Sequence, residues 1–338
     1  MCNIAGYSGN QQAAPILLEM LRKQEPYDGD MSTGVVTIHE GKLYIKKLVG
    51  NVDDFLREID LSELPGTIGI AHTRPAGSKD SPAVHPTWNP DCTMAIVTNG
   101  TGTRKFQPDW AQAAVMLNEN GYNYPIPDND LNKVTNSPRL RILLMDYYTK
   151  QGMSITEAFI KSTEHIYTDN VSVVVSQKYP DSIFALRVTR PMQVILENGE
   201  AYMATTRYAF PETLKSEPIM LPLAHACIIK KDGIHVTPHK INREPVEEMT
   251  PYTYKEAYKR FEKLLKSKDG PFYFDDLEYA VGREMRDLWP NDRSCIQHGR
   301  LVYDMLWQFD QEGRLKREVR VQDHRHGPRR RWYFWLED

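Results

Sequence analysis

Short runs of β-branched and aromatic residues fill much of the first 206 positions of the chain and predict extensive β structure. Most runs are bounded by Gly, Asp, Asn or Pro, which favour turns. The predicted strands are 3–8, 34–40, 42–49, 66–73, 93–99, 171–178, 182–189, 192–199 and 201–206. Turn signals at 39–42, 178–182 and 197–200 join neighbouring strands closely, so these strands are expected to pair antiparallel.

Apolar residues at three- and four-residue spacing predict four helices among these strands. The helices are expected at 14–24, 109–120, 137–150 and 154–166. Ser154 is the N-cap expected for the last of them, and Glu157 stands three positions later, as in a capping box. Helices that pack on antiparallel sheets give an α+β fold.

The pattern changes near residue 245. Three helical segments follow at 253–270, 274–289 and 294–313, and two strands surround a His-Gly-Pro turn within 317–336. Three helices followed by a hairpin are the order of a winged-helix module, a fold that often reads nucleic acid. The sequence therefore predicts two domains, 2–244 and 245–338.

Composition and charge narrow the classes of function. With 338 residues and 41% hydrophobic residues, the chain can bury a real core, and its net charge of −3 gives no general attraction for nucleic acid or membranes. The segment 314–331 differs, because it holds eight basic and two acidic residues. It is a candidate nucleic-acid surface; the alternative is a protein-packing or dimerising module with a solvated basic hairpin.

No signal peptide is recognisable, and no apolar run approaches the roughly 20 residues of a membrane span. We therefore expect a cytoplasmic protein that does not enter the membrane. The cysteines lie far apart without a CxxC pair and are interpreted as reduced thiols: Cys2, Cys92, Cys227 and Cys295. The group of Cys295, His298, His324 and His326 fits no standard zinc spacing, so neither a metal nor a cofactor is expected.

Cys2 carries the first candidate chemistry. Removal of Met1 would place a thiol, with a pKa of about 8.5, and a free amine, with a pKa of about 8, on one residue. The amine could then accept the proton of the thiol near neutral pH, which would activate the thiol as a nucleophile. Attack on an amide creates an oxyanion that needs aimed hydrogen-bond donors. Asn99 and Gly100, at the end of a predicted strand, offer a side-chain amide and a backbone N–H.

Five stretches in a fixed order resemble one family. They are MCNIAGYSG at the start, LLEMLRKQEPYDGDMSTGVV, GTIGIAHTRPAG, the pair His85–Pro86, and AIVTNG. Together they are similar to the class II glutamine amidotransferases, which are N-terminal nucleophile hydrolases, and most of all to the glutaminase domain of glucosamine-6-phosphate synthase. The resemblance covers about residues 2–240 and leaves out the C-terminal segment.

The resemblance implies a fold and a reaction. The fold would be an αββα sandwich, with two antiparallel sheets between helix layers. Cys2 would attack the side-chain amide of glutamine, and Asn99 with Gly100 would form the oxyanion hole. Arg74 would bind the α-carboxylate, with Thr73 and His72 beside it in the same substrate-binding strand. The products would be ammonia and, by way of a thioester on Cys2, glutamate.

Three positions depart from the family pattern. Asn3 replaces a glycine next to the nucleophile, and Pro75 replaces a tryptophan that gates a channel in the fused synthase. Asn136 occupies the place of the acid that binds the substrate α-ammonium, unless Asp128 or Asp130 takes that role. A substrate with a neutral or absent α-amine is therefore expected to be tolerated better than in a typical glutaminase.

The sequence is compatible with two functions. The first is a stand-alone amidotransferase or amidohydrolase that passes ammonia to a separate acceptor protein, since no acceptor domain of a known type is recognisable. The second is a weakly active or inactive sensor, which would act through its C-terminal module on nucleic acid or a protein partner. The first is favoured by Cys2, Arg74, Asn99 and Gly100, whereas the second is favoured by Asn3, Asn136 and the C-terminal module.

Overall fold

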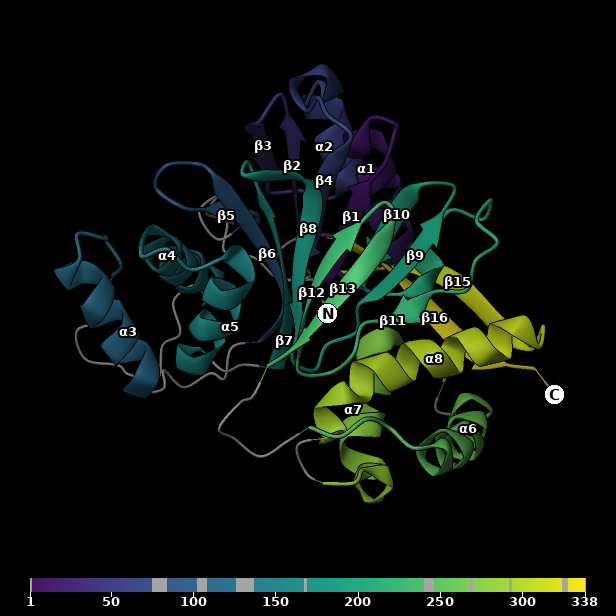
Figure 1. Cartoon of the computed structure of the whole chain (residues 1–338). Helices are drawn as coiled ribbons and strands as arrows, with labels where there is room; N and C mark the ends of the chain where they lie inside the picture. Colours follow the sequence, from purple (N-terminus) through teal and green to yellow (C-terminus); the bar gives the residue numbers. More distant parts are fainter. Residues whose placement is uncertain are drawn as a thin grey trace.

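The computed structural model contains two units that pack against each other (Figure 1). It describes residues 2–74, 84–101, 108–125, 137–166, 169–239, 246–267, 270–291, 294–323 and 328–337. The N-terminal unit is built around two antiparallel sheets, and the C-terminal unit consists of helices and a small third sheet. The predicted boundary between residues 244 and 245 falls outside the described residues and stays a prediction.

The first sheet has seven strands in the order β11-β9-β10-β1-β4-β2-β3. Every neighbouring pair in it is antiparallel. Its strands are β1 (Asn3–Ser8), β2 (Ser32–His39), β3 (Lys42–Leu48), β4 (Ile68–Arg74), β9 (Gln193–Glu197), β10 (Glu200–Ala204) and β11 (Ile219–Met220). β1 lies in the middle of the sheet, between β10 and β4, and is buried along its whole length.

The second sheet has six antiparallel strands in the order β13-β12-β8-β7-β6-β5. Its strands are β5 (Thr87–Trp88), β6 (Met94–Thr101), β7 (Asp169–Ser176), β8 (Tyr179–Arg187), β12 (His225–Lys230) and β13 (Gly233–Pro238). The inner faces of the two sheets share one core of mainly aliphatic side chains, among them Ile4, Val36, Val97 and Val173.

Helices cover the outer faces of both sheets (Figure 1). The first sheet carries α1 (Ala13–Gln24) and α2 (Val52–Glu58). The second carries α4 (Ser137–Lys150) and α5 (Ile155–His165), and α3 (Pro108–Glu119) packs on these two helices. Each layer has its own apolar core against its sheet. The expected four-layer arrangement of helices, two antiparallel sheets and helices is therefore confirmed.

Local predictions agree well with the observed elements. The hairpins β2–β3, β7–β8 and β9–β10 are present. The Ser154 side chain accepts a hydrogen bond from the Glu157 N–H, and the Glu157 side chain accepts one from the Ser154 N–H, which completes the expected capping box. α2, β12 and β13 were not expected from the sequence, nor were the two-residue strands β5 and β11.

The C-terminal unit contains α6 (Pro251–Leu265), β14 (Phe272–Tyr273), α7 (Phe274–Glu284), α8 (His298–Gln311), β15 (Leu315–Gln322) and β16 (Arg329–Leu336). The expected three helices and hairpin are present. The short strand β14 was not expected; it pairs with β16 and gives a three-stranded sheet in the order β14-β16-β15. The helices and this sheet enclose an apolar core.

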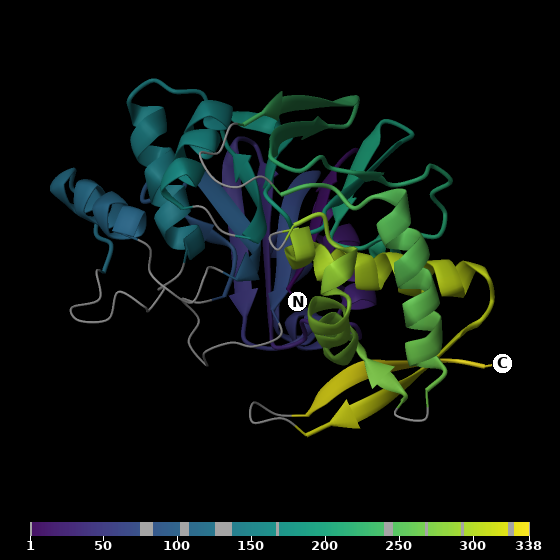
Figure 2. The same ribbon diagram turned by 90° about the horizontal axis from the view of Figure 1, so that it is seen from below.

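The two units share part of that core. Tyr27, which follows α1, is buried in the C-terminal core and stacks between Tyr208 of the N-terminal unit and Phe334 of β16. The backbone N–H of Trp332 donates a 2.7 Å hydrogen bond to the carbonyl of Pro26. Figure 2 shows the hairpin and α8 lying against the N-terminal unit. The C-terminal unit therefore contacts the N-terminal unit both through apolar side chains of a shared core and through a hydrogen bond between backbone groups.

No helix in the described ranges is both long enough and apolar enough to cross a membrane.

Candidate active site

Cys2 lies directly before β1, at the edge of the space between the two sheets. Asn3 and Ile4 of β1 stand opposite Thr73 and His72 of β4. Continuing this antiparallel register by one residue places Cys2 opposite Arg74. The thiol is half-buried and free. Burial raises its pKa, while the positive charges of the amino terminus, Arg74 and Arg190 act in the opposite direction.

Asn3 does not crowd the nucleophile, although it replaces a smaller residue of the family pattern. Successive side chains of a strand point to opposite faces, so Asn3 points away from the side on which Cys2 lies. Its Nδ2 donates to the backbone oxygen of Asp28 and, at 3.1 Å, to Oγ1 of Thr73. A side chain on Gly29, whose φ is +105°, would collide with this amide. Asn3 and Thr73 therefore hold in place the loop that contains Asp28 and Gly29.

His72 connects the two sheets. Its Nε2 lies 3.1 Å from the carbonyl oxygen of Thr98 in β6, and its ring lies 4.3 Å from that of His85. Burial and nearby positive charge lower the pKa of both histidines, that of His85 to about 3, so both rings are neutral at physiological pH. Because Thr98 precedes Asn99, this contact holds Asn99 close to the strand end that carries Arg74.

Asn99 has the environment expected of an oxyanion-hole donor. Its side chain is fully buried, and neither its Nδ2 nor its Oδ1 has a hydrogen-bond partner among the residues that the structure describes. Leaving a buried amide unpaired costs about 1–3 kcal/mol, so such a group is normally kept for a purpose. The next residue, Gly100, has a φ of +130°, and a Cβ there would lie 2.2 Å from the carbonyl oxygen of Asp169. Only glycine fits this position.

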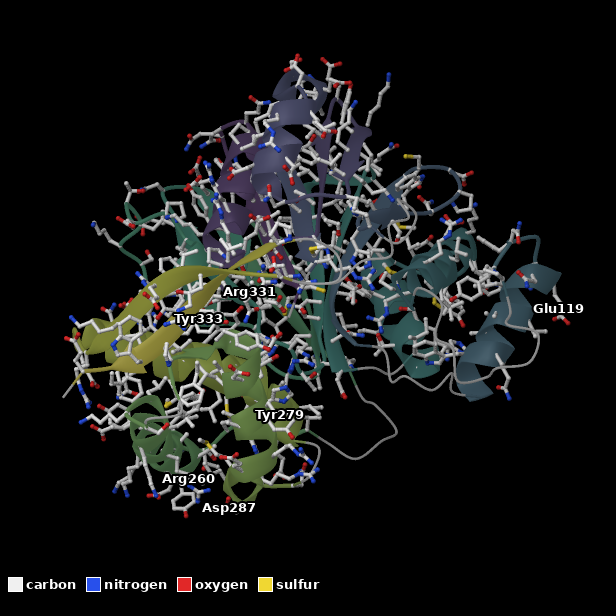
Figure 3. All side chains as sticks on the ribbon, turned by 180° about the vertical axis from the view of Figure 1, so that it is seen from behind. Glu119, Arg260, Tyr279, Asp287, Arg331 and Tyr333 are labelled. Carbon is white, nitrogen blue, oxygen red and sulfur yellow. The ribbon has the colours of Figure 1, made fainter. Side chains whose placement is uncertain are left out.

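The C-terminal unit reaches the start of β1 along two routes. In one, Nη2 of Arg331 lies 2.9 Å from Asp30 and 3.3 Å from Asp28, the residue whose carbonyl accepts from Asn3. In the other, Glu278 of α7 lies 3.6 Å from Arg190, whose charge acts on the Cys2 thiol. Figure 3 shows Arg331 where the hairpin meets the N-terminal unit, and the pair Arg260 and Asp287 on the far outer end.

Comparison with known proteins identifies the N-terminal unit. The chain is 33% identical over 238 residues to glutamine–fructose-6-phosphate aminotransferase (isomerizing) of Caldanaerobacter subterraneus subsp. tengcongensis, which covers 69% of this chain and 36% of that protein. The enzyme of the same name from Clostridium acetobutylicum is 32% identical over 202 residues, or 59% of this chain and 31% of that protein. The chain contains a class II glutamine amidotransferase-like domain. Its match spans about a third of the length of these relatives.

Solved structures agree on the fold. Glutamine phosphoribosylpyrophosphate amidotransferase from B. subtilis, complexed with ADP and GMP, superimposes with a TM-score of 0.58 at 15% identity, covering 90% of this chain and 64% of that one. A structure described as the allosteric regulatory enzyme of purine biosynthesis gives 0.59 at 15% identity, with 90% and 63% covered. No family model matches the chain.

The amidotransferase-like domain brings most of the predicted site residues together. Cys2, Arg74, Asn99 and Gly100 lie at one end of the space between the sheets, while Thr73 and His72 bind neighbouring protein groups. Asn136, Asp128 and Asp130 lie outside the described residues, as do His324, His326 and the side chain of Cys295. In the described part of the chain, no group of three or more candidate ligands could hold a metal ion.

Several basic side chains in the described part of the segment 314–331 are buried or paired within the protein. Arg331 is 2% exposed, Arg314 is paired with Glu262 and Glu312, and Arg320 is paired with Glu318. The third helix, α8, directs Tyr303 and Trp307 at Tyr27 and Tyr208 of the N-terminal unit. The observed contacts therefore favour protein packing over the nucleic-acid surface that its charge predicted.

Proposed function

We propose that the chain hydrolyses the side-chain amide of glutamine, or of a close analogue, with Cys2 as the nucleophile. The observation that carries this proposal is the buried amide of Asn99, which has no hydrogen-bond partner among the described residues. Asn99 stands next to Gly100 in β6, and the contact between His72 and Thr98 holds this part of β6 near the end of β4 that carries Arg74. A nucleophile, two aimed donors and a carboxylate-binding cation are the parts that amide hydrolysis requires. The names of the similar enzymes point to glutamine as the amide donor.

The reaction follows from these parts. The thiol of Cys2 gives its proton to the free α-amine, and the thiolate attacks the amide carbon. The oxyanion receives hydrogen bonds from the Asn99 amide and the Gly100 N–H, which stabilise it most in the transition state. The C–N bond then breaks, and the leaving nitrogen takes the proton from the α-amine of Cys2 and departs as ammonia. Water hydrolyses the thioester, which releases glutamate and restores the thiol. Arg74 holds the α-carboxylate through a bidentate contact.

We further propose that the ammonia passes to an acceptor on a separate protein, because the unit that follows the amidotransferase-like domain in this chain is a small one of helices and a three-stranded sheet. The order helix, strand, two helices and hairpin supports a winged-helix-like assignment for the C-terminal unit. Its third helix and basic strand pack on the amidotransferase-like domain, which supports a role at the Cys2 site. The alternative function, a sensor, differs from this proposal because it predicts little or no hydrolysis of glutamine.

Labelling by a glutamine-analogue electrophile tests this proposal. We expect protein purified from cells to lack Met1, because the amine acts as a base only when it is free, and to gain one adduct at Cys2. Intact mass and peptide mapping measure both, and excess glutamine should slow the labelling. An adduct at Cys92, which is also half-buried, or full glutamine hydrolysis by protein that retains Met1 would contradict the mechanism.

The Asn99→Ala variant tests the oxyanion hole. We expect kcat for glutamine to fall by about 10²–10³-fold with little change in KM, because the amide acts mainly in the transition state. Initial rates of ammonia release provide the measurement. Asn123→Ala, at an exposed position, is the matched control and should keep the native rate. If kcat decreased by less than tenfold, Asn99 would not be the oxyanion donor.

A further inference from the structure

Glu278 is an acidic side chain of the C-terminal unit at the border of the Cys2 site. It lies in α7, and its Oε1 is 3.6 Å from Nη1 of Arg190 and 3.6 Å from Nε2 of His298 in α8. Its side chain is 17% exposed. Both contacts are longer than a hydrogen bond, so they leave the lone pairs of the carboxylate unused, and Arg190 brings a positive charge close.

Arg190 links this carboxylate to the reacting groups. The segment before it, Val188 and Thr189, donates two backbone hydrogen bonds to the carbonyl of Asn170. Asn170 pairs with Gly100 across the second sheet, so the segment runs beside the proposed oxyanion hole. The N-terminal end of the chain also lies beside α7 and α8 in two perpendicular views (Figures 1 and 2). Through Arg190, Glu278 therefore borders the segment that runs beside the Cys2 site, although it is 276 positions away from Cys2 in the chain.

The carboxylate has unused capacity to accept a hydrogen bond. Its Oε1 is buried and has no hydrogen-bond partner among the residues that the structure describes. Burial acts to raise the pKa of Glu278, but its electrostatic interactions with the amino terminus, His298 and Arg190 outweigh burial, and the pKa lies below its ordinary value. A buried, ionised oxygen without a donor is costly unless a cationic donor binds to it.

We propose that Glu278 binds the α-ammonium group of the amide substrate, while Arg74 binds its α-carboxylate. This inference rests on the proposed function and names the acid that the family pattern fails to supply at Asn136. An ammonium donates charge-assisted hydrogen bonds, which are about twice as strong as neutral ones. The substrate site then spans both units, and the C-terminal unit determines which amides are accepted.

The consequence is the reverse of the preference that Asn136 suggests. With Glu278 in place, the native enzyme discriminates in favour of a charged α-amine. We expect kcat/KM for L-glutamine to exceed that for its des-amino analogue, glutaramate, by on the order of tenfold or more, since loss of one partner of a buried charge pair costs at least that much affinity. This comparison needs only the native full-length protein.

Glu278→Gln isolates the charge of the carboxylate. We expect this variant to reduce the ratio of kcat/KM for glutamine over glutaramate by about tenfold or more, through a higher KM for glutamine, while glutaramate changes little. Glu278→Asp, which keeps the charge on a shorter side chain, should recover part of the ratio. Glu284→Gln removes an exposed carboxylate from the same helix and should leave the ratio as in the native protein.

The ratio separates binding from general damage. If Glu278 only supports packing, both substrates lose rate equally and the ratio stays constant, which would overturn the inference. A native enzyme that hydrolyses glutaramate as well as glutamine would overturn it even if no Glu278 variant folded. Failure of the proposed function looks different: the native protein would hydrolyse neither amide and would take up no label at Cys2, and the inference would fall with it.

Discussion

Cys2→Ala lowers kcat for glutamine hydrolysis by at least about 10⁴-fold if the thiol is the nucleophile, because the covalent route through the thioester is then lost. The substitution leaves the α-amine, Arg74, Asn99 and Gly100 in place. Since Arg74 still holds the α-carboxylate, we expect glutamine to bind to the variant with nearly native affinity. Ammonia release gives kcat, and calorimetry on the full-length protein gives the affinity.

Cys2→Ser distinguishes the roles of the two groups on the first residue. A hydroxyl is a much weaker nucleophile than a thiolate at neutral pH, so this variant should also be nearly inactive despite its similar size. Cys92→Ala is the control, because Cys92 is a second free, half-buried thiol outside the site. Hydrolysis at more than about one hundredth of the native rate in Cys2→Ala would mean that water is activated by another group.

The bounds of a strand could be predicted closely from the sequence where apolar and polar residues alternate or where the apolar run is continuous. β1 was expected at 3–8 and is observed there, because its apolar run ends at Ser8 and Gly9, a turn signal. α2 was missed because only Val52 and Phe55 of its seven residues are buried. Its cap, in which Asn51 accepts from Asp54, was the signal that could have revealed it.

The core of the site could also be predicted, because its residues sit in short motifs at strand ends. Cys2 directly precedes β1, Arg74 ends β4, and Asn99 and Gly100 lie just before the end of β6, and the two sheets bring these strand ends together. Glu278 and Arg190 could not be found in this way. They meet only through the docking of the two units, and no local periodicity encodes a contact between residues 88 positions apart.

The contacts of Arg331 between the two units could not be predicted from the sequence for the same reason. Arg331 stands in a run of three arginines, which in a sequence is typical of a solvated or phosphate-binding surface. In the folded chain, alternation along β16 turns Arg330 to solvent and Arg331 inward. One strand thus carries a surface charge and a buried one side by side, and only the tertiary structure distinguishes them.

This alternation gives a matched pair of variants for stability. Arg331→Met should lower the free energy of unfolding by about 3–5 kcal/mol, because it leaves Asp28 and Asp30 buried without their cation. Arg330→Met removes the same positive charge from the exposed neighbouring position and should change stability by less than about 0.5 kcal/mol. Urea unfolding of both full-length variants, followed by fluorescence, measures the difference.

The same pair separates the two interpretations of the basic hairpin. If Arg331 holds the units together, its loss also loosens Asp28, whose carbonyl accepts from Asn3 next to Cys2. Activity should then fall with Arg331→Met and stay native with Arg330→Met, at temperatures where both variants are folded. If the hairpin instead serves a phosphate surface, the exposed Arg330 matters more for nucleic-acid binding at low salt, and neither variant unfolds early. Equal stability of the two variants would contradict the docking role of Arg331.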